Sequence, residues 1–212
     1  MAHVSETCEL PEPSLLTHVH TTAATVHEAL CTADIHQGLS EKGLLPSTHL
    51  VDAAYISAEL IVNSRDTHGV ELKGPTRQNA SWQSQIEDGY TADQFIVDWD
   101  HQVAYCPQGQ CATSWTEQVN RKINRSGIMV TFREEVCAPC IARERCTHAK
   151  NTGRRLHLSP QVQYEALQEA RAWYDSDEGK RQYASRAGVE GTLSQGIRGF
   201  GAYRKPIYQT LR

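Results

Sequence analysis

The 212-residue sequence lacks any apolar run near the roughly 18 residues needed to span a bilayer, and its N-terminus has no signal-peptide pattern. These absences argue against a membrane protein and against a secreted one, so we expect a cytoplasmic chain. No internal repeat or low-complexity tract is present. With 39% hydrophobic and 22% charged residues, the composition is typical of a globular chain with one domain, or one domain with an insertion.

Basic residues are scarce in the first part of the chain. Residues 1–118 contain 4 Lys/Arg against 16 Asp/Glu, although the net charge of the whole chain is only −4. By contrast, residues 119–155 contain 9 Lys/Arg against 3 acids, and residues 180–212 contain 7 against 1. The average charge argues against a nucleic-acid binder, but local basic blocks can face a polyanion. The alternative is that these blocks are ordinary solvated faces.

The first part of the chain has a mixed α/β pattern. Two β-rich segments, residues 3–7 and 15–21, flank a proline-containing turn and predict a hairpin. The elements after it are predicted from apolar periodicity and from turn residues: a helix over 25–45, a strand over 49–55, a helix over 57–67 with Ser57 as N-cap, and a strand over 70–73. This alternation predicts helices that cover a sheet.

Residues 76–155 have poor helical periodicity, short β-like runs and five of the seven cysteines. We predict that they form a Cys-rich, β-rich insertion. The remaining segment, residues 156–212, becomes helical again, with one helix from Pro160 and another over about 180–195. The sequence therefore predicts three parts: an N-terminal core part over 1–75, the insertion over 76–155, and a C-terminal helical part over 156–212.

Two sets of polar residues are candidates for a functional site. Asp52 ends a predicted strand, where α/β folds place ligands. Its alternative role is an ordinary turn or helix-cap residue. Tyr183, Arg186 and Glu190 have the spacing of residues on one face of a helix. Their alternative role is a surface ion pair between residues four positions apart.

The clustered cysteines are candidates for a metal site. Cys137 and Cys140 are separated by two residues, Cys146 follows six positions later, and Cys106 lies about thirty positions earlier. Because no secretory signal is present, metal ligation or free thiols are favoured over disulfides. Four thiolates would complete a tetrahedral structural Zn²⁺ site. Cys111 and His148 are additional candidates, and free buried thiols are the alternative.

Three segments, taken in order, resemble the DDE transposases of bacterial insertion sequences. They are HVHTT at 18–22, LVDAAYIS at 50–57 and RAGVEGT at 186–192. The resemblance is strongest to a branch that carries a cysteine-containing insertion, here CPQG at 106–109 followed by Cys137, Cys140 and Cys146. It extends along nearly the whole chain. It implies an RNase H-like core, which is a mixed sheet with flanking helices, interrupted here by the Cys-rich segment.

The resemblance also implies an activity, namely DNA strand cleavage and transfer at the ends of a mobile element. In this family three acids hold two divalent ions, Mg²⁺ or Mn²⁺. Asp52 matches the second acid and Glu190 the third. The implied partners are DNA and, as a candidate, another transposase chain, and the implied location is the bacterial cytoplasm, at the nucleoid when DNA is bound.

Further positions match the family's tyrosine–arginine–glutamate signature. Tyr183 and Arg186 match its first two members and are implied DNA contacts. The signature normally has a basic residue seven positions after the glutamate. Here that position is Ile197 and the basic residue is the next one, Arg198, to which the phosphate contact would shift.

The family's first acid has no counterpart in this sequence. The only Asp before Asp52 is Asp34, which lies inside a predicted helix, and Glu6 and Glu9 lie in a segment that resembles the family's second strand. We therefore expect a copy truncated at both ends and catalytically incomplete on its own. Two alternatives remain: a non-enzymatic, zinc-stabilised module that binds DNA or protein, and an inert remnant with an unpaired sheet edge.

Overall fold

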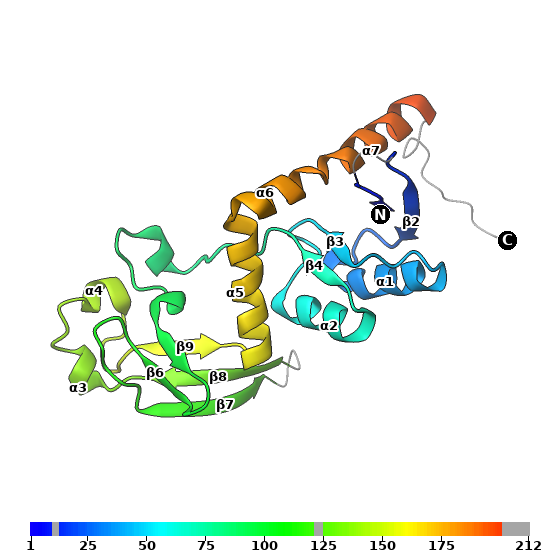
Figure 1. Ribbon diagram of the computed structural model, residues 1–212. Helices are drawn as coiled ribbons and strands as arrows, with labels where there is room; N and C mark the ends of the chain where they lie inside the picture. The colour runs from blue at the N-terminus through cyan, green and yellow to red at the C-terminus, as the bar shows by residue number, and fades with distance from the viewer. Residues whose placement is uncertain (10–12, 121–124, 201–212) are drawn as a thin grey trace. The chain divides into compact units, whose positions relative to one another are not determined.

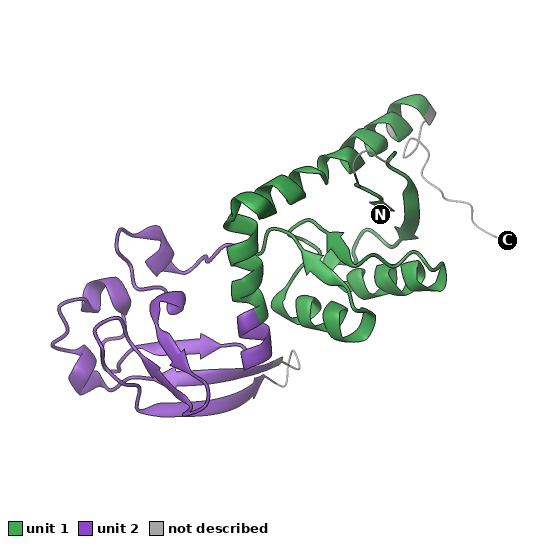
Figure 2. Ribbon diagram, viewed as in Figure 1, with its two compact units in different colours: residues 1–76, 166–212 green, residues 77–165 purple. Residues whose placement is uncertain are grey.

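The computed structural model describes residues 1–9, 13–120 and 125–200, and the chain divides into two compact units (Figures 1 and 2). Unit 1 comprises residues 1–76 and 166–212, and unit 2 comprises residues 77–165. Helices and small sheets occur together, which is consistent with the α/β class. The division into 1–75, 76–155 and 156–212 stays a prediction.

Unit 1 begins with the predicted hairpin. β1 (Ala2–Glu6) pairs antiparallel with β2 (Leu16–Thr21), and the register sets Val4 opposite Val19. Residues 10–12 of the connecting turn lie outside the described part of the chain. The hairpin prediction is confirmed for the strands.

The first helical segment is shorter than predicted. A 3-10 turn, η1 (Glu28–Leu30), precedes α1 (Thr32–Glu41). The turn forms because the ring nitrogen Nδ1 of His27 accepts a hydrogen bond from the backbone N–H of Ala29 at 3.2 Å. α1 buries Ile35, His36 and Leu39, which recur at helical spacing.

The next helix, α2 (Ala58–His68), is bounded by local signals in the sequence. The hydroxyl of Ser57 accepts a hydrogen bond from the backbone N–H of Leu60 at 3.3 Å, so the predicted N-cap is confirmed. Gly69 ends the helix with φ of 66°, a left-handed conformation that glycine adopts without strain. Its N–H donates to the carbonyls of Arg65 and Ser64.

α2 connects two parallel strands, β3 (Thr48–Leu50) and β4 (Glu71–Lys73). β3 ends earlier than predicted because the chain turns after it, and the N–H of Tyr55 donates to the carbonyl of Asp52 at 2.9 Å. The buried side chains around this pair are Val51, Ile56, Ile61, Leu72 and Ala166. A Cβ atom at Gly74 would lie 2.2 Å from the carbonyl oxygen of Val51, so this close approach requires glycine.

The strands of unit 1 form two separate two-stranded sheets, β1–β2 and β3–β4. The single mixed sheet expected from the sequence is therefore not formed among the described residues. The physical reason is that no hydrogen bonds join β1 to β3 in the described part, so one edge of each strand stays open. Figure 1 shows α1 and α2 beside β3 and β4.

The C-terminal helical part of unit 1 has a break that periodicity does not predict. α5 (Gln161–Asp175) is followed by α6 (Asp177–Ala184) and α7 (Ala187–Phe200), instead of one helix over 180–195. At the junction the N–H of Arg186 donates to the carbonyl of Tyr183, three residues back, as in a 3-10 turn. This tighter turn interrupts the helix at Ser185 and Arg186.

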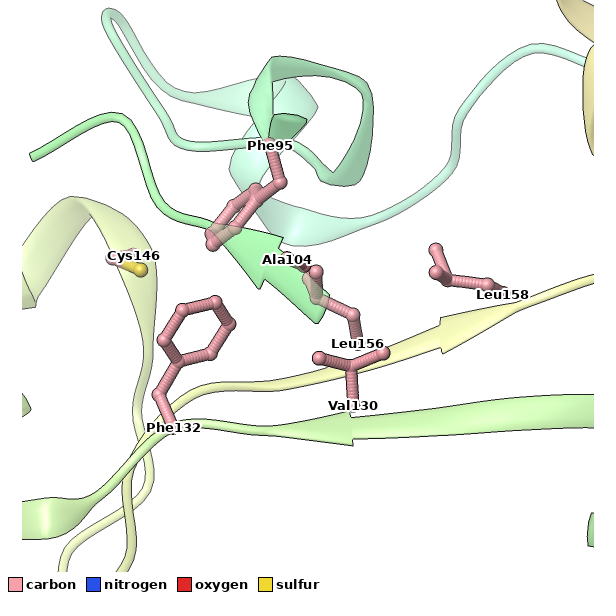
Figure 3. Close-up of a cluster of buried hydrophobic side chains, with 7 residues drawn as sticks. All are labelled: Phe95, Ala104, Val130, Phe132, Cys146, Leu156 and Leu158. Carbon is pink, nitrogen blue, oxygen red and sulfur yellow. The ribbon is translucent and has the colours of Figure 1, made fainter. Parts of the chain in front are cut away.

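Unit 2 is rich in strands. One antiparallel sheet has two strands, β5 (Ile96–Asp98) and β6 (Val103–Tyr105). A second antiparallel sheet has three strands in the order β7 (Ser114–Asn120), β8 (Arg125–Thr131) and β9 (Arg155–Leu158). Its short helices are η2 (Trp82–Gln85), η3 (Ala92–Gln94), α3 (Glu134–Cys137) and α4 (Arg143–Cys146). Figure 3 shows the buried cluster that holds these elements, formed by Phe95, Ala104, Val130, Phe132, Cys146, Leu156 and Leu158. Whether this unit is an insertion into a family core stays a prediction.

None of the helices in the described part of the chain combines the length and the apolar character that crossing a membrane requires.

Candidate functional site

Arg186 brings the two predicted acids together. Its Nη2 atom lies 3.7 Å from Oδ2 of Asp52, and its Nη1 atom lies 3.7 Å from Oε1 of Glu190. Asp52 and Glu190 are far apart in the sequence, and one guanidinium bridges their carboxylates. The structure thus places three of the predicted site residues at one point of unit 1.

The local structure leaves the carboxylates accessible. Asp52 lies in the turn after β3, where its Oδ1 accepts a hydrogen bond from the N–H of Ala53 at 2.7 Å. Glu190 lies in the first turn of α7. The side chains of Asp52 and Glu190 are 56% and 74% exposed, whereas that of Arg186 is 22% exposed. Both carboxylates therefore have oxygen atoms free to meet a ligand from solvent.

Tyr183 lies near the guanidinium of Arg186. Its ring centre is 5.9 Å from Cζ of Arg186 and 5.3 Å from the ring centre of Tyr174, which meets it edge-on. Burial raises the pKa of Tyr183 above its usual value, and Arg186 acts in the opposite direction. The hydroxyl is therefore protonated at neutral pH and can donate a hydrogen bond. Tyr183 lies in α6 and Glu190 in α7, so the helix junction brings them together instead of the single helix face predicted.

A cleft of about 270 Å³ lies beside Asp52 and includes Asp52 and Arg186, but not Glu190, in its lining. β1, β3, α1 and α7 contribute to its walls. Apolar side chains that line it include Ile35, Leu39, Leu44, Val51, Val189 and Leu193. The cleft thus combines an apolar interior with a charged end.

One wall of the cleft is the open edge of β1. The N–H of Thr22 donates to the carbonyl of Met1, so these two residues form a hydrogen-bonded pair of the hairpin. In an antiparallel ladder such pairs alternate along the strand. Up to the register shift between Ser5 and Glu6, the alternation directs the backbone groups of Ala2 and Val4 away from β2.

The other wall is the open edge of β3. The N–H of Val51 donates to the carbonyl of Lys73, which shows which alternate residues of β3 bond to β4 in this parallel pair. The backbone groups of Thr48 and Leu50 therefore point away from β4. Both strands line the cleft, so it is bordered on two sides by strand edges that pair with no other strand among the described residues.

Glu6 is a residue that the sequence analysis set aside and that the structure places in this cleft. Both of its carboxylate oxygens are buried and have no hydrogen-bond partner among the described residues. A Cβ atom at Gly188, in the first turn of α7, would lie 3.1 Å from Oε1 of Glu6. The strand alternation of β1 could have indicated that Glu6 shares a face with Val4, but not that this face meets α7.

Arg198 is not brought to the carboxylates. It is exposed in the last turn of α7, eight positions after Glu190. Helix geometry places it roughly 12 Å farther along the axis and roughly 80° around it. The side chain of Ile197 lies outside the described part of the chain.

In unit 2 the four predicted cysteine ligands line one small pocket of about 30 Å³. Cys106 follows β6, Cys137 ends α3, Cys140 follows it closely, and Cys146 ends α4. All are free thiols. Within the described residues, however, no three His, Cys, Asp or Glu side chains are arranged closely enough to hold a metal ion as they stand.

The two additional candidates lie elsewhere in unit 2. The thiol of Cys111 is exposed and donates to the carbonyl of Ala112 at 3.3 Å. The ring of His148 stacks on Trp82 with 3.7 Å between the ring centres. Neither residue lines the pocket of the other four cysteines. The structure therefore separates these two from the set Cys106, Cys137, Cys140 and Cys146.

Charge and burial couple the pocket residues. Burial raises the pKa of the Cys146 thiol to about 11, Arg154 opposes this shift, and the other three cysteines add to it. Burial also lowers the pKa of Arg154, and Cys146 opposes that shift. Without a metal ion, Cys146 is therefore a neutral thiol at pH 7.

Comparison with known protein families gives a match for the second half of the chain. Residues 105–207 match the family model of a transposase DDE domain. No curated protein and no solved structure matches the chain. The matched segment contains Tyr183, Arg186, Glu190 and the clustered cysteines, whereas Asp52 lies outside it. The match therefore shows that residues 105–207, slightly less than half of the chain, are similar to a transposase DDE domain.

Proposed function

We propose that the chain takes part in DNA transposition and that Asp52 and Glu190 are two of the acids that bind divalent ions, Mg²⁺ or Mn²⁺. The observation that carries this proposal is the convergence of both carboxylates on Arg186, at 3.7 Å each. The family match supports the function class, and DNA is the partner class of such a domain.

The chemistry requires these residue types. Carboxylate oxygens are the hard ligands that Mg²⁺ and Mn²⁺ prefer. A pair of such ions, when bound, activates a water or a 3′-hydroxyl and stabilises the leaving oxygen of a DNA phosphodiester. The exposed carboxylates of Asp52 and Glu190 are free to serve as these ligands. Arg186, released from them, can pair with a phosphate, and the hydroxyl of Tyr183 can donate to a phosphate oxygen.

We further propose that the acid set is incomplete within residues 1–212. The open edges of β1 and β3 border the same cleft, and a strand between them would join the two small sheets into one RNase H-like mixed sheet. Such a strand, contributed from outside residues 1–212, would carry the first acid to the end of the cleft where Asp52 lies. The proposal therefore expects no DNA cleavage by this chain alone.

The metal site is tested by iron-mediated cutting of the polypeptide. Fe²⁺ replaces Mg²⁺, and ascorbate with peroxide generates radicals that cut the chain next to the bound ion. We expect cuts near residues 52 and 190 that excess Mg²⁺ suppresses. Asp52→Asn should abolish both cuts. Asp66→Asn, at an exposed acid of α2, is the matched control and should leave them unchanged.

Two results would contradict these assignments. Cuts confined to other parts of the chain would show that Asp52 and Glu190 do not share a metal site. Cleavage or joining of duplex DNA by the purified chain with Mg²⁺ would instead show that the acid set is complete, while leaving the metal site in place.

A second proposal concerns unit 2. We propose that Cys106, Cys137, Cys140 and Cys146 bind a structural Zn²⁺ ion. The supporting observation is that all four thiols line one pocket although they come from separate segments. Such an ion would stabilise the short helices α3 and α4, which have few residues to bury. If the chain has lost catalysis, this module is the candidate for a purely DNA- or protein-binding role.

A further inference from the structure

The cysteine pocket of unit 2 contains two cationic side chains and no acidic one. Arg143 and Arg154 line it together with the four thiols, and none of its lining residues is Asp or Glu. A buried cation is costly unless an anion compensates it. The groups in the lining that can become anions most readily are the four cysteines.

Arg154 is held against the cysteines with part of its hydrogen-bonding capacity unused. Its Nη1 donates to the carbonyl of Cys146 at 2.9 Å, and its Cζ lies 5.7 Å from the ring centre of Phe95. Its Nε atom is buried and has no partner among the described residues. Cys146 is itself 9% exposed and Arg154 is partly buried, so the guanidinium and the thiol are both largely shielded from solvent.

Arg143 shows the same pattern from α4. Its Nη2 donates to the carbonyls of Ala149 and Lys150 at 2.6 and 3.3 Å, which ties the loop after α4 to the pocket. Its Nη1 atom is buried and, within the described chain, lacks a hydrogen-bond partner. Each arginine therefore has one buried N–H group unpaired beside the cysteines.

A divalent ion bound by four thiolates would balance the charges of the two arginines. Such a complex has a net charge of −2, because four thiolates surround one dication. The two guanidinium groups contribute +2. We propose that Arg154, with Arg143, is the positioning cation of a tetrathiolate site, which balances the thiolate charge and orients Cys146. This inference rests on the proposed Zn²⁺ site.

Metal binding would also rearrange the thiols. As they stand they are not in ligand geometry, so they would have to move inward and lose their protons. Thiolate sulfur is an acceptor, so the unpaired Nε of Arg154 and Nη1 of Arg143 would then gain partners. The arginines would therefore favour the metal-bound arrangement over the metal-free one.

The test uses the purified full chain and the metals Zn²⁺ and Co²⁺. Metal content gives the stoichiometry, competition with a chromophoric chelator gives the Zn²⁺ affinity, and the Co²⁺ spectrum reports thiolate ligands through its charge-transfer band. The variants are Arg154→Gln, Arg154→Lys, Cys137→Ser and the control Arg155→Gln, at an exposed arginine next to Arg154.

We expect one Zn²⁺ per chain for the wild type and for Arg155→Gln, and a weakened Co²⁺ thiolate band for Cys137→Ser. Arg154→Gln should bind Zn²⁺ at least tenfold more weakly. Arg154→Lys, which keeps the charge, should recover most of that loss. Recovery by lysine distinguishes a charge role from a packing role.

Two outcomes separate the proposals. A wild-type chain that binds no Zn²⁺ and shows no thiolate band with Co²⁺ overturns the zinc site and this inference together. A wild-type chain that binds Zn²⁺, with Arg154→Gln of equal affinity, overturns only the role of the arginines. If Arg154→Gln does not fold, the Zn²⁺ affinities of Arg143→Gln and Arg154→Lys are compared with that of the control Arg155→Gln. An Arg143→Gln chain that binds Zn²⁺ as tightly as the control then overturns the inference.

Discussion

At the scale of single residues, Arg186 links the two carboxylates of the candidate site. It lies 3.7 Å from each of two carboxylates and is itself mostly buried, while its partners are exposed. Ion pairs with exposed partners contribute only about 0–1 kcal/mol to stability. The arrangement of Arg186, Asp52 and Glu190 is therefore better suited to ligand exchange than to holding the fold together.

Replacing Arg186 by glutamine should increase the affinity of the site for Mn²⁺. The guanidinium repels a dication, and Coulomb's law gives an effect on the order of 1 kcal/mol at a few ångströms in a solvent-like medium, or about fivefold. Titration with Mn²⁺, followed by electron paramagnetic resonance, measures the change. Arg65→Gln is the control, because Arg65 pairs with Glu71 and Glu169 instead. Weaker Mn²⁺ binding by Arg186→Gln would contradict this placement of the charges.

A second residue-scale prediction concerns His36 and His49, whose rings are joined by a 2.9 Å hydrogen bond between Nε2 and Nδ1. Burial lowers the pKa of each to about 4, and His68 also lowers that of His36. In the unfolded chain both have pKa values near 6.5. The unfolded state therefore binds more protons between pH 6.5 and 4, and stability is full above this window and lost as the pH falls through it.

We expect this pair to lower the free energy of unfolding by at least about 1 kcal/mol between pH 7 and pH 5.5. Urea unfolding at both pH values measures the loss. Comparison with His49→Gln separates the histidine contribution from that of the carboxylates, because the variant should lose less stability on acidification. An equal loss in both proteins would contradict the assignment of neutral buried rings.

At the scale of elements, the sequence was sufficient to predict those helix ends and turns that local residues determine. Ser57 and Gly69 set the ends of α2 through their own hydrogen bonds, and both act within four residues along the chain. The β1–β2 hairpin was likewise predictable from alternation and turn residues. Such features depend on steric contacts and backbone hydrogen bonds between residues close in the sequence, so a short segment is enough to predict them.

Features that depend on distant contacts were not predictable in the same way. The break at Ser185–Arg186 follows no proline, and apolar spacing runs through it. The position of Glu6 beside Gly188, and the convergence of four cysteines from separate segments, depend on tertiary packing. For Asp52 and Glu190 the motifs indicated the residues, but only the structure shows that Arg186 joins them.

Removal of the α2 cap tests the local part of this account. Ser57→Ala should lower the free energy of unfolding by about 1 kcal/mol, because the N–H of Leu60 loses its acceptor. Chemical denaturation at pH 7 measures the difference. Ser40→Ala, at an exposed position inside α1, is the control and should be neutral or slightly stabilising. Equal losses in the two variants would show that the cap contributes nothing.

At the scale of the whole molecule, the distribution of charge matters more than its sum. The net charge of −4 combines an acidic first part with two basic blocks, over 119–155 and 180–212. The first block includes the arginines of the cysteine pocket, and the second includes the helix junction with Arg186. Both blocks lie largely within the matched transposase domain, where DNA is the expected partner.

We predict that exposed basic residues of the first block contact DNA phosphates. Lys150 and Arg155 are both exposed in unit 2. For duplex DNA, the logarithm of the binding constant falls with that of the salt concentration, with a slope of about −0.9 per neutralised phosphate. The double variant Lys150→Gln and Arg155→Gln should therefore bind more weakly and lose up to about two units of slope. Fluorescence anisotropy across a salt series measures both quantities.

The matched control for this DNA experiment is Lys42→Gln, at an exposed lysine of the acidic first part. It removes a positive charge from the same molecule, so it reports the effect of net charge alone. If the binding depends on a local contact, Lys42→Gln changes the slope little and the double variant changes it clearly. Equal effects per charge removed would instead mean that DNA senses only the overall charge, and the first basic block would then be an ordinary solvated face.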